Sequence, residues 1–131
     1  MENKILIVDD EPHILQLIAS RLKANHYQAI VAANAEQAFR AAHEEKPDVI
    51  LLDIRMPGET GMSLFESLKL SKSTSAIPVI FITAYPQDNM RDKVLAMGAV
   101  DFIAKPFNAD DLLSKVAKAL ATRPESKGPH E

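Results

Sequence analysis

The sequence predicts an α/β fold: a doubly wound parallel sheet of five strands, with five helices packed on its two faces. Five short apolar runs, rich in β-branched residues, alternate along the chain with five segments whose apolar residues recur at helical spacing. This alternation is typical of a parallel sheet that is covered on both sides. Because crossover connections are right-handed, few topologies remain, and the flavodoxin-like strand order 2-1-3-4-5 is the commonest of them.

The predicted strands are the five apolar runs. In the third run four apolar residues stand together, which indicates a strand buried on both faces of the sheet. Pro78 is expected at the first residue of the fourth strand, where a missing N–H group is tolerated. The expected strands comprise residues 4–8, 28–31, 49–52, 78–82 and 99–104.

The first two predicted helices carry start and stop signals. Pro12 fits the first turn of a helix whose end is marked by Asn25 and His26. Asn34, with Gln37 three residues later, forms a candidate capping pair for the second helix.

The other three helices are placed by apolar spacing and by capping residues. Apolar residues at helical spacing mark the third helix over residues 62–68. Asp88 is a candidate cap for the fourth helix, and Gly98 is expected just past its end. Asn108 is expected to open the fifth helix.

Length and composition limit the classes of protein that fit. A chain of 131 residues with 47% hydrophobic and 25% charged residues suits one globular domain. The net charge of −3 argues against a general nucleic-acid surface, and the absence of cysteine excludes disulfides and thiolate metal sites. No apolar run approaches the roughly 20 residues that span a bilayer, and the first residues do not resemble a signal peptide. We therefore expect no membrane contact and a cytoplasmic location.

The last residues differ in composition from the rest of the chain. From Thr122 onward the sequence consists largely of Pro, Gly, Ser and charged residues. We therefore expect the folded domain over residues 1–121 and a flexible tail, or the start of a linker, over residues 122–131.

Polar side chains follow the expected strands at their carboxyl ends, which share one edge of a parallel sheet. Asp9 and Asp10 follow the first strand, and Asp53 follows the third. Thr83 and Lys105 follow the fourth and fifth. Ligands bind along this edge in open α/β sheets. Three carboxylates, a hydroxyl and an ammonium group are thus expected to converge there.

Carboxylates gathered in this way require a counter-charge. Two carboxylates ~4 Å apart repel by about 4 kcal/mol at an effective dielectric constant of 20. One ammonium group does not balance three such charges, whereas a hard cation with oxygen ligands, for which Mg²⁺ is suited, does. Asp10 and Asp53 are the expected ligands, and Asp9 is close enough to act through water. Beside such a cation Asp53 is a natural nucleophile, as in aspartyl-phosphate chemistry, with Lys105 neutralising the phosphoryl oxygens.

Four motifs at these strand ends resemble the receiver domain of two-component response regulators. They are Val-Asp-Asp-Glu-Pro at 8–12, Leu-Leu-Asp-Ile-Arg-Met-Pro-Gly at 51–58, Ile-Thr-Ala at 82–84 and Ala-Lys-Pro-Phe at 104–107. Together, in order and at the usual spacings, they form a specific signal that covers roughly residues 3–121. The stretch 98–107 is most similar to receivers of the NtrC and FixJ type.

The resemblance implies that this domain is a phosphoprotein switch in a two-component phosphorelay. Asp53 would accept a phosphoryl group from a sensor histidine kinase or a phosphotransfer protein, and Lys105 would bind that group. Mg²⁺, for which Mn²⁺ can substitute, would bind in the acidic pocket and also contact the backbone carbonyl of Arg55. The domain would catalyse only its own phosphorylation and dephosphorylation and is not otherwise an enzyme. Arg55 and Tyr85 match positions that tune the rate of phosphate loss.

The resemblance also implies a switch made of Thr83 and Phe102. The hydroxyl would move toward the phosphoryl group and the aromatic ring would turn inward, so that the surface of the fourth helix, fifth strand and fifth helix changes for a partner. That partner is an unidentified output protein or an effector domain outside this sequence, and a phosphorylation-dependent dimer on the same surface is a further expectation. Lys105-Pro106 is often a cis peptide in this family.

Alternatives remain at this stage. Phe102 lies in an apolar strand, where core packing is its more frequent use. A flavodoxin-type nucleotide enzyme is disfavoured because the acids at 9–11 repel phosphate and no G-x-G-x-x-G motif is present. The stronger alternative is a receiver-fold module for interaction or dimerisation that works without phosphorylation, and Mg²⁺ affinity separates the two hypotheses.

Overall fold

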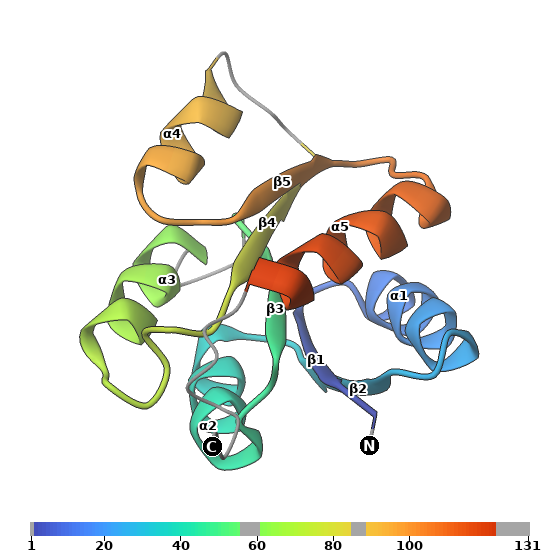
Figure 1. Cartoon of the computed structure of the whole chain (residues 1–131), viewed down its shortest axis with the longest axis horizontal. Helices are drawn as coiled ribbons and strands as arrows, with labels where there is room; N and C mark the ends of the chain where they lie inside the picture. Colours follow the sequence, from blue (N-terminus) through green and yellow to red (C-terminus); the bar gives the residue numbers. More distant parts are fainter. Residues whose placement is uncertain (1, 56–60, 85–88, 123–131) are drawn as a thin grey trace.

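The computed structural model describes residues 2–55, 61–84 and 89–122. Its parallel sheet has the strand order β2-β1-β3-β4-β5, which confirms the predicted topology (Figure 1). The strands are β1 (Lys4–Val8), β2 (Gln28–Ala32), β3 (Val49–Asp53), β4 (Val79–Thr83) and β5 (Asp101–Ala104). The helices are α1 (Pro12–Ala24), α2 (Ala35–Glu45), α3 (Gly61–Leu70), α4 (Met90–Ala96) and α5 (Ala109–Thr122).

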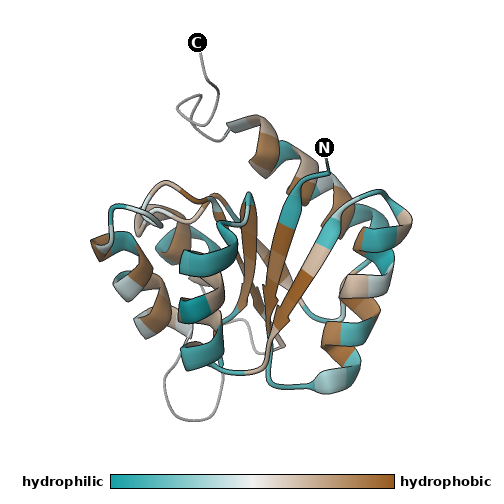
Figure 2. Cartoon of the chain, turned by 90° about the horizontal axis from the view of Figure 1, so that it is seen from below, coloured by the Kyte–Doolittle hydropathy of each residue, from teal (hydrophilic) through white to brown (hydrophobic). Residues whose placement is uncertain are grey.

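Two apolar cores lie on opposite faces of the sheet. Successive side chains of a strand point to opposite faces, so Ile50 and Leu52 join one core while Val49 and Leu51 join the other. Helices α2, α3 and α4 cover the first face, and α1 and α5 cover the second (Figure 1). Figure 2 shows the apolar strands enclosed between these helices. Because β3 and β4 are buried on both faces, their carboxyl ends are held firmly in place.

Several of the predicted helix ends are confirmed. The N–H of Gln37 donates to Oδ1 of Asn34 at 2.8 Å, as the capping pair required. Oδ1 of Asn108 accepts from two N–H groups at the start of α5. Gly98 lies just past α4 with φ +112°, a conformation that side chains rarely adopt. The predicted cap Asp88 lies outside the described residues, and the N-cap of α4 is Asn89.

The boundaries of β4, β5 and α5 differ from the prediction by one or two residues. β4 begins at Val79 rather than at Pro78. β5 begins at Asp101 rather than at residue 99, because the N–H of Ala99 still donates to the carbonyl of Val94 in the turn that ends α4. At the other end, Thr122 belongs to α5 rather than to the tail. Among the described helices, none has the length and apolar character needed to cross a bilayer.

The start of α3 lies directly against the end of β3. The N–H of Gly61 donates to the carbonyl of Ile54 at 2.8 Å. A Cβ atom at Gly61 would lie 2.1 Å from the carbonyl oxygen of Asp53 and 2.9 Å from its carbonyl carbon. Only glycine allows this approach, so Gly61 lets α3 pack against the backbone that carries Asp53.

We predict that Gly61→Ala lowers the free energy of unfolding by about 1–3 kcal/mol, because the helix or the strand end must shift to admit the methyl group. Urea unfolding of the two proteins measures this difference. Glu66→Ala, on the exposed side of the same helix, serves as the control and should change stability by less than about 0.5 kcal/mol. Equal stabilities of Gly61→Ala and the unmodified protein would contradict the steric argument.

Candidate functional site

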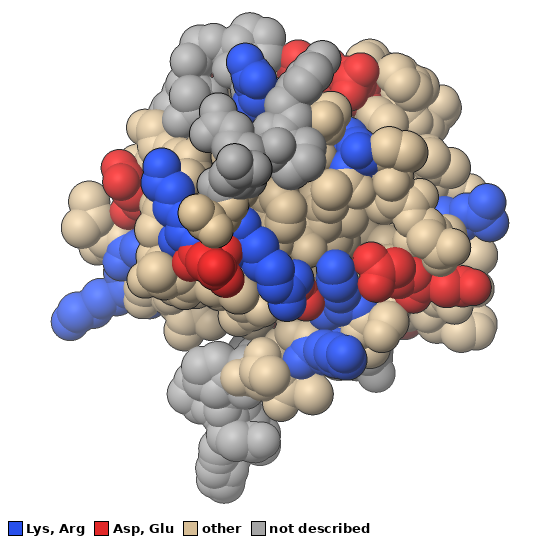
Figure 3. All heavy atoms as spheres, turned by 90° about the horizontal axis from the view of Figure 1, so that it is seen from above, with Lys and Arg blue, Asp and Glu red and all other residues tan. Residues whose placement is uncertain are grey.

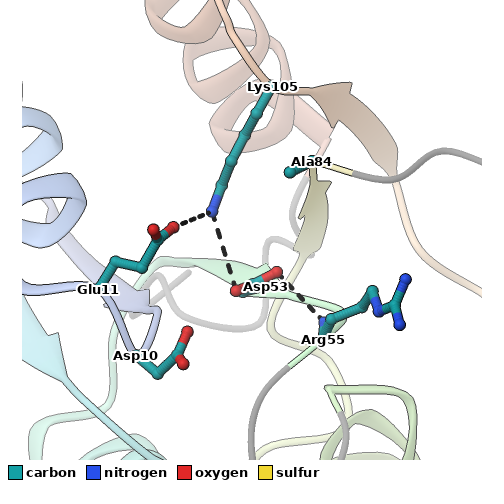
Figure 4. A pocket seen from close by; sticks show the side chains of 6 residues that line it. All are labelled: Asp10, Glu11, Asp53, Arg55, Ala84 and Lys105. Atoms are coloured by element: carbon teal, nitrogen blue, oxygen red, sulfur yellow. Dashed lines mark hydrogen bonds and ion pairs between the residues drawn. The ribbon is translucent and has the colours of Figure 1, made fainter.

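The carboxyl ends of the strands frame a cavity of about 260 Å³. Asp53 is the last residue of β3, and Lys105 directly follows β5. The acids that follow β1 approach from the opposite side (Figure 4). The residues that line the cavity are Asp10, Glu11, Asp53, Arg55, Ala84 and Lys105. The predicted convergence of acids and an ammonium group at this edge is therefore present.

Asp53 lies at the carboxyl end of β3, where it lines the cavity and has little contact with solvent. Its side chain is 6% exposed, and its Oδ1 accepts the N–H of Arg55 at 3.2 Å. Its Oδ2 lies 3.8 Å from Nζ of Lys105. Asp9 is also buried, whereas Asp10 is exposed. One carboxylate oxygen from each of these three acids lies within 4.8 Å of the other two.

Lys105 reaches Asp9, Glu11 and Asp53 from the opposite side of the cavity. Its Nζ donates to Oδ2 of Asp9 at 2.7 Å and to Oε1 of Glu11 at 3.3 Å. Its backbone N–H donates to the carbonyl of Thr83 at 2.7 Å, which ties the loop after β5 to the end of β4. The peptide bond between Lys105 and Pro106 is cis. The ammonium group thus acts as a counter-charge to these acids.

The electrostatics of the cavity are set by burial and by like charges. Burial, followed by the negative charge of Asp9, raises the pKa of Asp53 to about 6, although Lys105 and the N–H of Arg55 pull it down. Burial alone would lower the pKa of Lys105, but its hydrogen bond to Asp9 and the nearby carboxylate charges outweigh burial and raise it. The single positive charge of Lys105 therefore does not fully balance the negative charges of these carboxylates.

The donor set suits a hard divalent cation. Within the described part of the chain, Asp9, Asp10 and Asp53 are the one group of three or more potential metal ligands that lie close together. All their ligand atoms are oxygens, and Asp10 and Asp53 face the cavity, where room for water remains. Oxygen ligands combined with retained water are the coordination that Mg²⁺ prefers.

The two residues of the predicted switch, Thr83 and Phe102, do not line the cavity. Thr83 is fully buried at the end of β4. Phe102 is 8% exposed and packs in the core between the sheet and helices α2, α3 and α4. The structure therefore shows Phe102 in the core-packing role. Tyr85 lies outside the described residues.

Glu11 is the cavity residue to which the sequence analysis assigned no role. It was counted only among the acids at 9–11 that disfavour a nucleotide-binding enzyme. Glutamate is not among the residues preferred at a helix N-cap, so its position directly before Pro12 was a hint in the sequence. In the structure Glu11 occupies the N-cap of α1, and its side chain does not cap the helix. Such a side chain is free to reach elsewhere, and here it reaches Lys105.

Comparisons with known proteins agree with this geometry. Residues 5–117 match the family model of the response regulator receiver domain. The chain is 38% identical over 120 residues to protein PilH of Pseudomonas aeruginosa, an alignment that covers 90% of this chain and 98% of PilH. It is 39% identical over 116 residues to the phosphate regulon transcriptional regulatory protein PhoB of the same organism, covering 88% of this chain and 51% of PhoB. The chain thus spans about half the length of PhoB.

Solved structures show the same fold. A response regulator receiver domain protein from Methanospirillum hungatei aligns with a TM-score of 0.87 and 30% identity, over 98% of this chain and 100% of that chain. NtrX from Brucella abortus aligns with a TM-score of 0.85 and 33% identity, over 93% of this chain and 28% of that chain.

The raised pKa of Asp53 predicts a pH dependence of stability. An acid whose folded-state pKa lies above its unfolded value stabilises the fold at low pH, and this contribution is lost as pH rises through the folded pKa. This stability is lost between pH 3.8, the ordinary pKa of an aspartate, and about pH 6, the pKa of Asp53 in the folded protein. Without divalent cations, Asp53→Asn should therefore be more stable than the unmodified protein above this window, by at most about 3 kcal/mol.

Chemical denaturation in chelator at about pH 8 and about pH 4.5 measures this difference. The gain in the free energy of unfolding should shrink toward the acidic end. Glu66→Gln, which removes one negative charge from an exposed position on α3, should show no comparable gain. A stability gain for Asp53→Asn that does not vary with pH would show that ionisation of Asp53 is not its cause.

Proposed function

Because this chain belongs to the response regulator receiver domain family, we propose that it is a phosphorylation-dependent signalling switch with Asp53 as the phosphoryl acceptor. Receiver domains are signalling modules rather than enzymes that act on separate substrates. One observation carries the proposal: the Asp53 carboxylate stands at the end of the doubly buried strand β3 and faces a cavity that also holds an ammonium group and further carboxylates. This is the geometry that an aspartyl-phosphate site requires.

The proposed reaction is transfer of a phosphoryl group from a phosphohistidine of a sensor histidine kinase or a phosphotransfer protein. A carboxylate oxygen of Asp53 attacks phosphorus, the P–N bond breaks, and its electron pair stays on the imidazole. With a pKa of about 6, Asp53 is mostly ionised at neutral pH and can act as the nucleophile. Lys105 Nζ lies 3.8 Å from Asp53 Oδ2, close enough to neutralise charge on the phosphoryl oxygens.

We propose a Mg²⁺ site, with Mn²⁺ as a substitute, formed by Asp10, Asp53 and the backbone carbonyl of Arg55, with Asp9 acting through water. Receiver domains bind Mg²⁺ at an acidic pocket, and the cluster of three carboxylates supports the same assignment here. When bound, the cation would supply positive charge to the transferring phosphoryl group. Arg55 lines the cavity and, together with Tyr85, is proposed to modulate phosphate loss.

The proposed response to phosphorylation runs through Thr83 and Phe102 to the surface of α4, β5 and α5. Ion pairs already join these elements: Arg91 on α4 lies 3.2 Å from Asp101 on β5. Lys115 on α5 donates to the carbonyl of Phe102 at 3.0 Å. A displacement of Phe102 would therefore reach both helices. We propose that an output partner, or a second copy of the phosphorylated domain, reads this surface.

Two relatives of different length correspond to two kinds of output partner for this domain. PilH has nearly the length of this chain, whereas PhoB, named as a transcriptional regulatory protein, is about twice as long. We propose a receiver domain that ends with α5 at Thr122, followed by a tail or linker over 123–131, with either a separate output protein or an attached effector domain. Basic and acidic side chains are intermixed on the face shown in Figure 3, and the net charge is −3, so this domain is not expected to bind nucleic acid directly.

We predict that acetyl phosphate and Mg²⁺ add one phosphoryl group to the protein and that Asp53→Asn abolishes the addition, because it removes the nucleophile. Intact-protein mass spectrometry measures the change, with a chelator-treated sample as the metal control. Circular dichroism verifies that the variant is folded. A folded protein that gains no phosphoryl group under any condition would contradict the proposal and favour an interaction module that works without phosphorylation.

Mg²⁺ affinity gives a second prediction. Titration calorimetry should detect Mg²⁺ binding, and Asp10→Asn should weaken it by at least about tenfold because an anionic ligand is lost. Glu66→Gln changes the net charge equally without touching the cavity and should bind Mg²⁺ as the unmodified protein does. Equal losses in both variants would mean that overall charge, rather than coordination by Asp10, governs binding.

A further inference from the structure

Glu11 has no structural role that accounts for its side chain. Its backbone is fully used: the N–H donates to Oδ1 of Asp9 at 2.9 Å, and the carbonyl accepts the N–H groups of Ile14 and Leu15 in the first turn of α1. Its side chain makes no helix cap. Its carboxylate instead lines the cavity and lies 3.3 Å from Nζ of Lys105 (Figure 4). The backbone contacts fix the position of the Glu11 backbone, and the ion pair with Lys105 fixes the position of its carboxylate.

Two acids that follow β1 hold the ammonium group more closely than Asp53 does. Nζ of Lys105 lies 2.7 Å from Asp9 and 3.3 Å from Glu11, against 3.8 Å from Asp53. Asp9 is buried, whereas the side chain of Glu11 is 49% exposed. Of these two close partners, Glu11 is therefore the one that lines the cavity and is open to solvent.

We propose that Glu11 is a positioning residue that holds Lys105 toward β1 and, by its negative charge, opposes entry of free phosphate-type anions into the cavity. The inference deepens the proposed function, since it concerns the selectivity of the same site. A small free anion must compete with the carboxylate of Glu11 for the ammonium group. A phosphoryl group carried by a protein partner differs, because contacts between the two protein surfaces add binding energy. This added energy offsets the competition with the Glu11 carboxylate for the ammonium group.

Inorganic phosphate provides the first test, because its binding does not require phosphorylation. Phosphate is titrated into ¹⁵N-labelled protein in the presence of Mg²⁺, and the backbone amide signals of Arg55 and Ala84, which line the cavity, report binding. Glu11→Gln keeps the size of the side chain and removes its charge. We expect phosphate to bind about two- to fivefold more tightly to this variant, the range for one half-exposed ion pair.

Two matched variants isolate the cause. Glu66→Gln makes the same change in net charge on exposed α3 and should leave phosphate affinity unchanged. Glu11→Asp restores the negative charge and should return the affinity toward that of the unmodified protein. Equal affinities of Glu11→Gln and the unmodified protein, or an equal gain in Glu66→Gln, would overturn the proposal.

Acetyl phosphate kinetics provide the second test. The Glu11→Gln variant should reach half-saturation at a donor concentration lower by the same factor, because the charge acts on donor entry. If the unmodified protein is not phosphorylated at Asp53, the proposed function fails while the phosphate titration still tests Glu11. If Asp53 is phosphorylated and neither phosphate affinity nor half-saturation changes in Glu11→Gln, the function stands and the role of Glu11 is wrong.

Discussion

The repulsion among Asp9, Asp10 and Asp53 is the constraint on which the site depends. The two parallel strands β1 and β3 end side by side, so their terminal acids are brought within 4.8 Å whatever their charge. Packing of both sheet faces holds them there, and burial, followed by the negative charge of Asp9, raises the pKa of Asp53 to about 6. The apolar cores thus maintain an arrangement of charges that would separate in a flexible chain.

The ammonium group of Lys105 neutralises the acids of the cavity unequally. Lys105 approaches from β5 on the far side of β4, and its closest contacts are to Asp9 and Glu11 rather than to Asp53. Of the two buried acids, Asp53 therefore has the more distant counter-charge. An added cation would relieve the repulsion around a carboxylate in this state.

The fold and the positions of the acids were predictable because they depend on local sequence. Apolar runs defined the strands, and Asn34 with Gln37 defined a helix start. The approach of Glu11 to Lys105 was not predictable, because it joins residues 94 positions apart through side-chain conformations that no local pattern records. The same holds for Gly61, whose need for close contact with Asp53 appears only when α3 is packed against β3. Thr83 was expected at the edge, and its complete burial appears only in the folded structure.

The burial of Thr83 and Phe102 bears on how a change in the cavity would travel. Thr83 pairs with Ala104 across β4 and β5, and Phe102 pairs with Phe81 two residues earlier on the same two strands. Both side chains are buried, so neither can move without displacing packed neighbours. Close packing favours discrete alternative arrangements over gradual adjustment. A chemical event at Asp53 that draws on Thr83 would therefore be expressed as a repacking around Phe102, whose backbone carbonyl is held by Lys115 of α5.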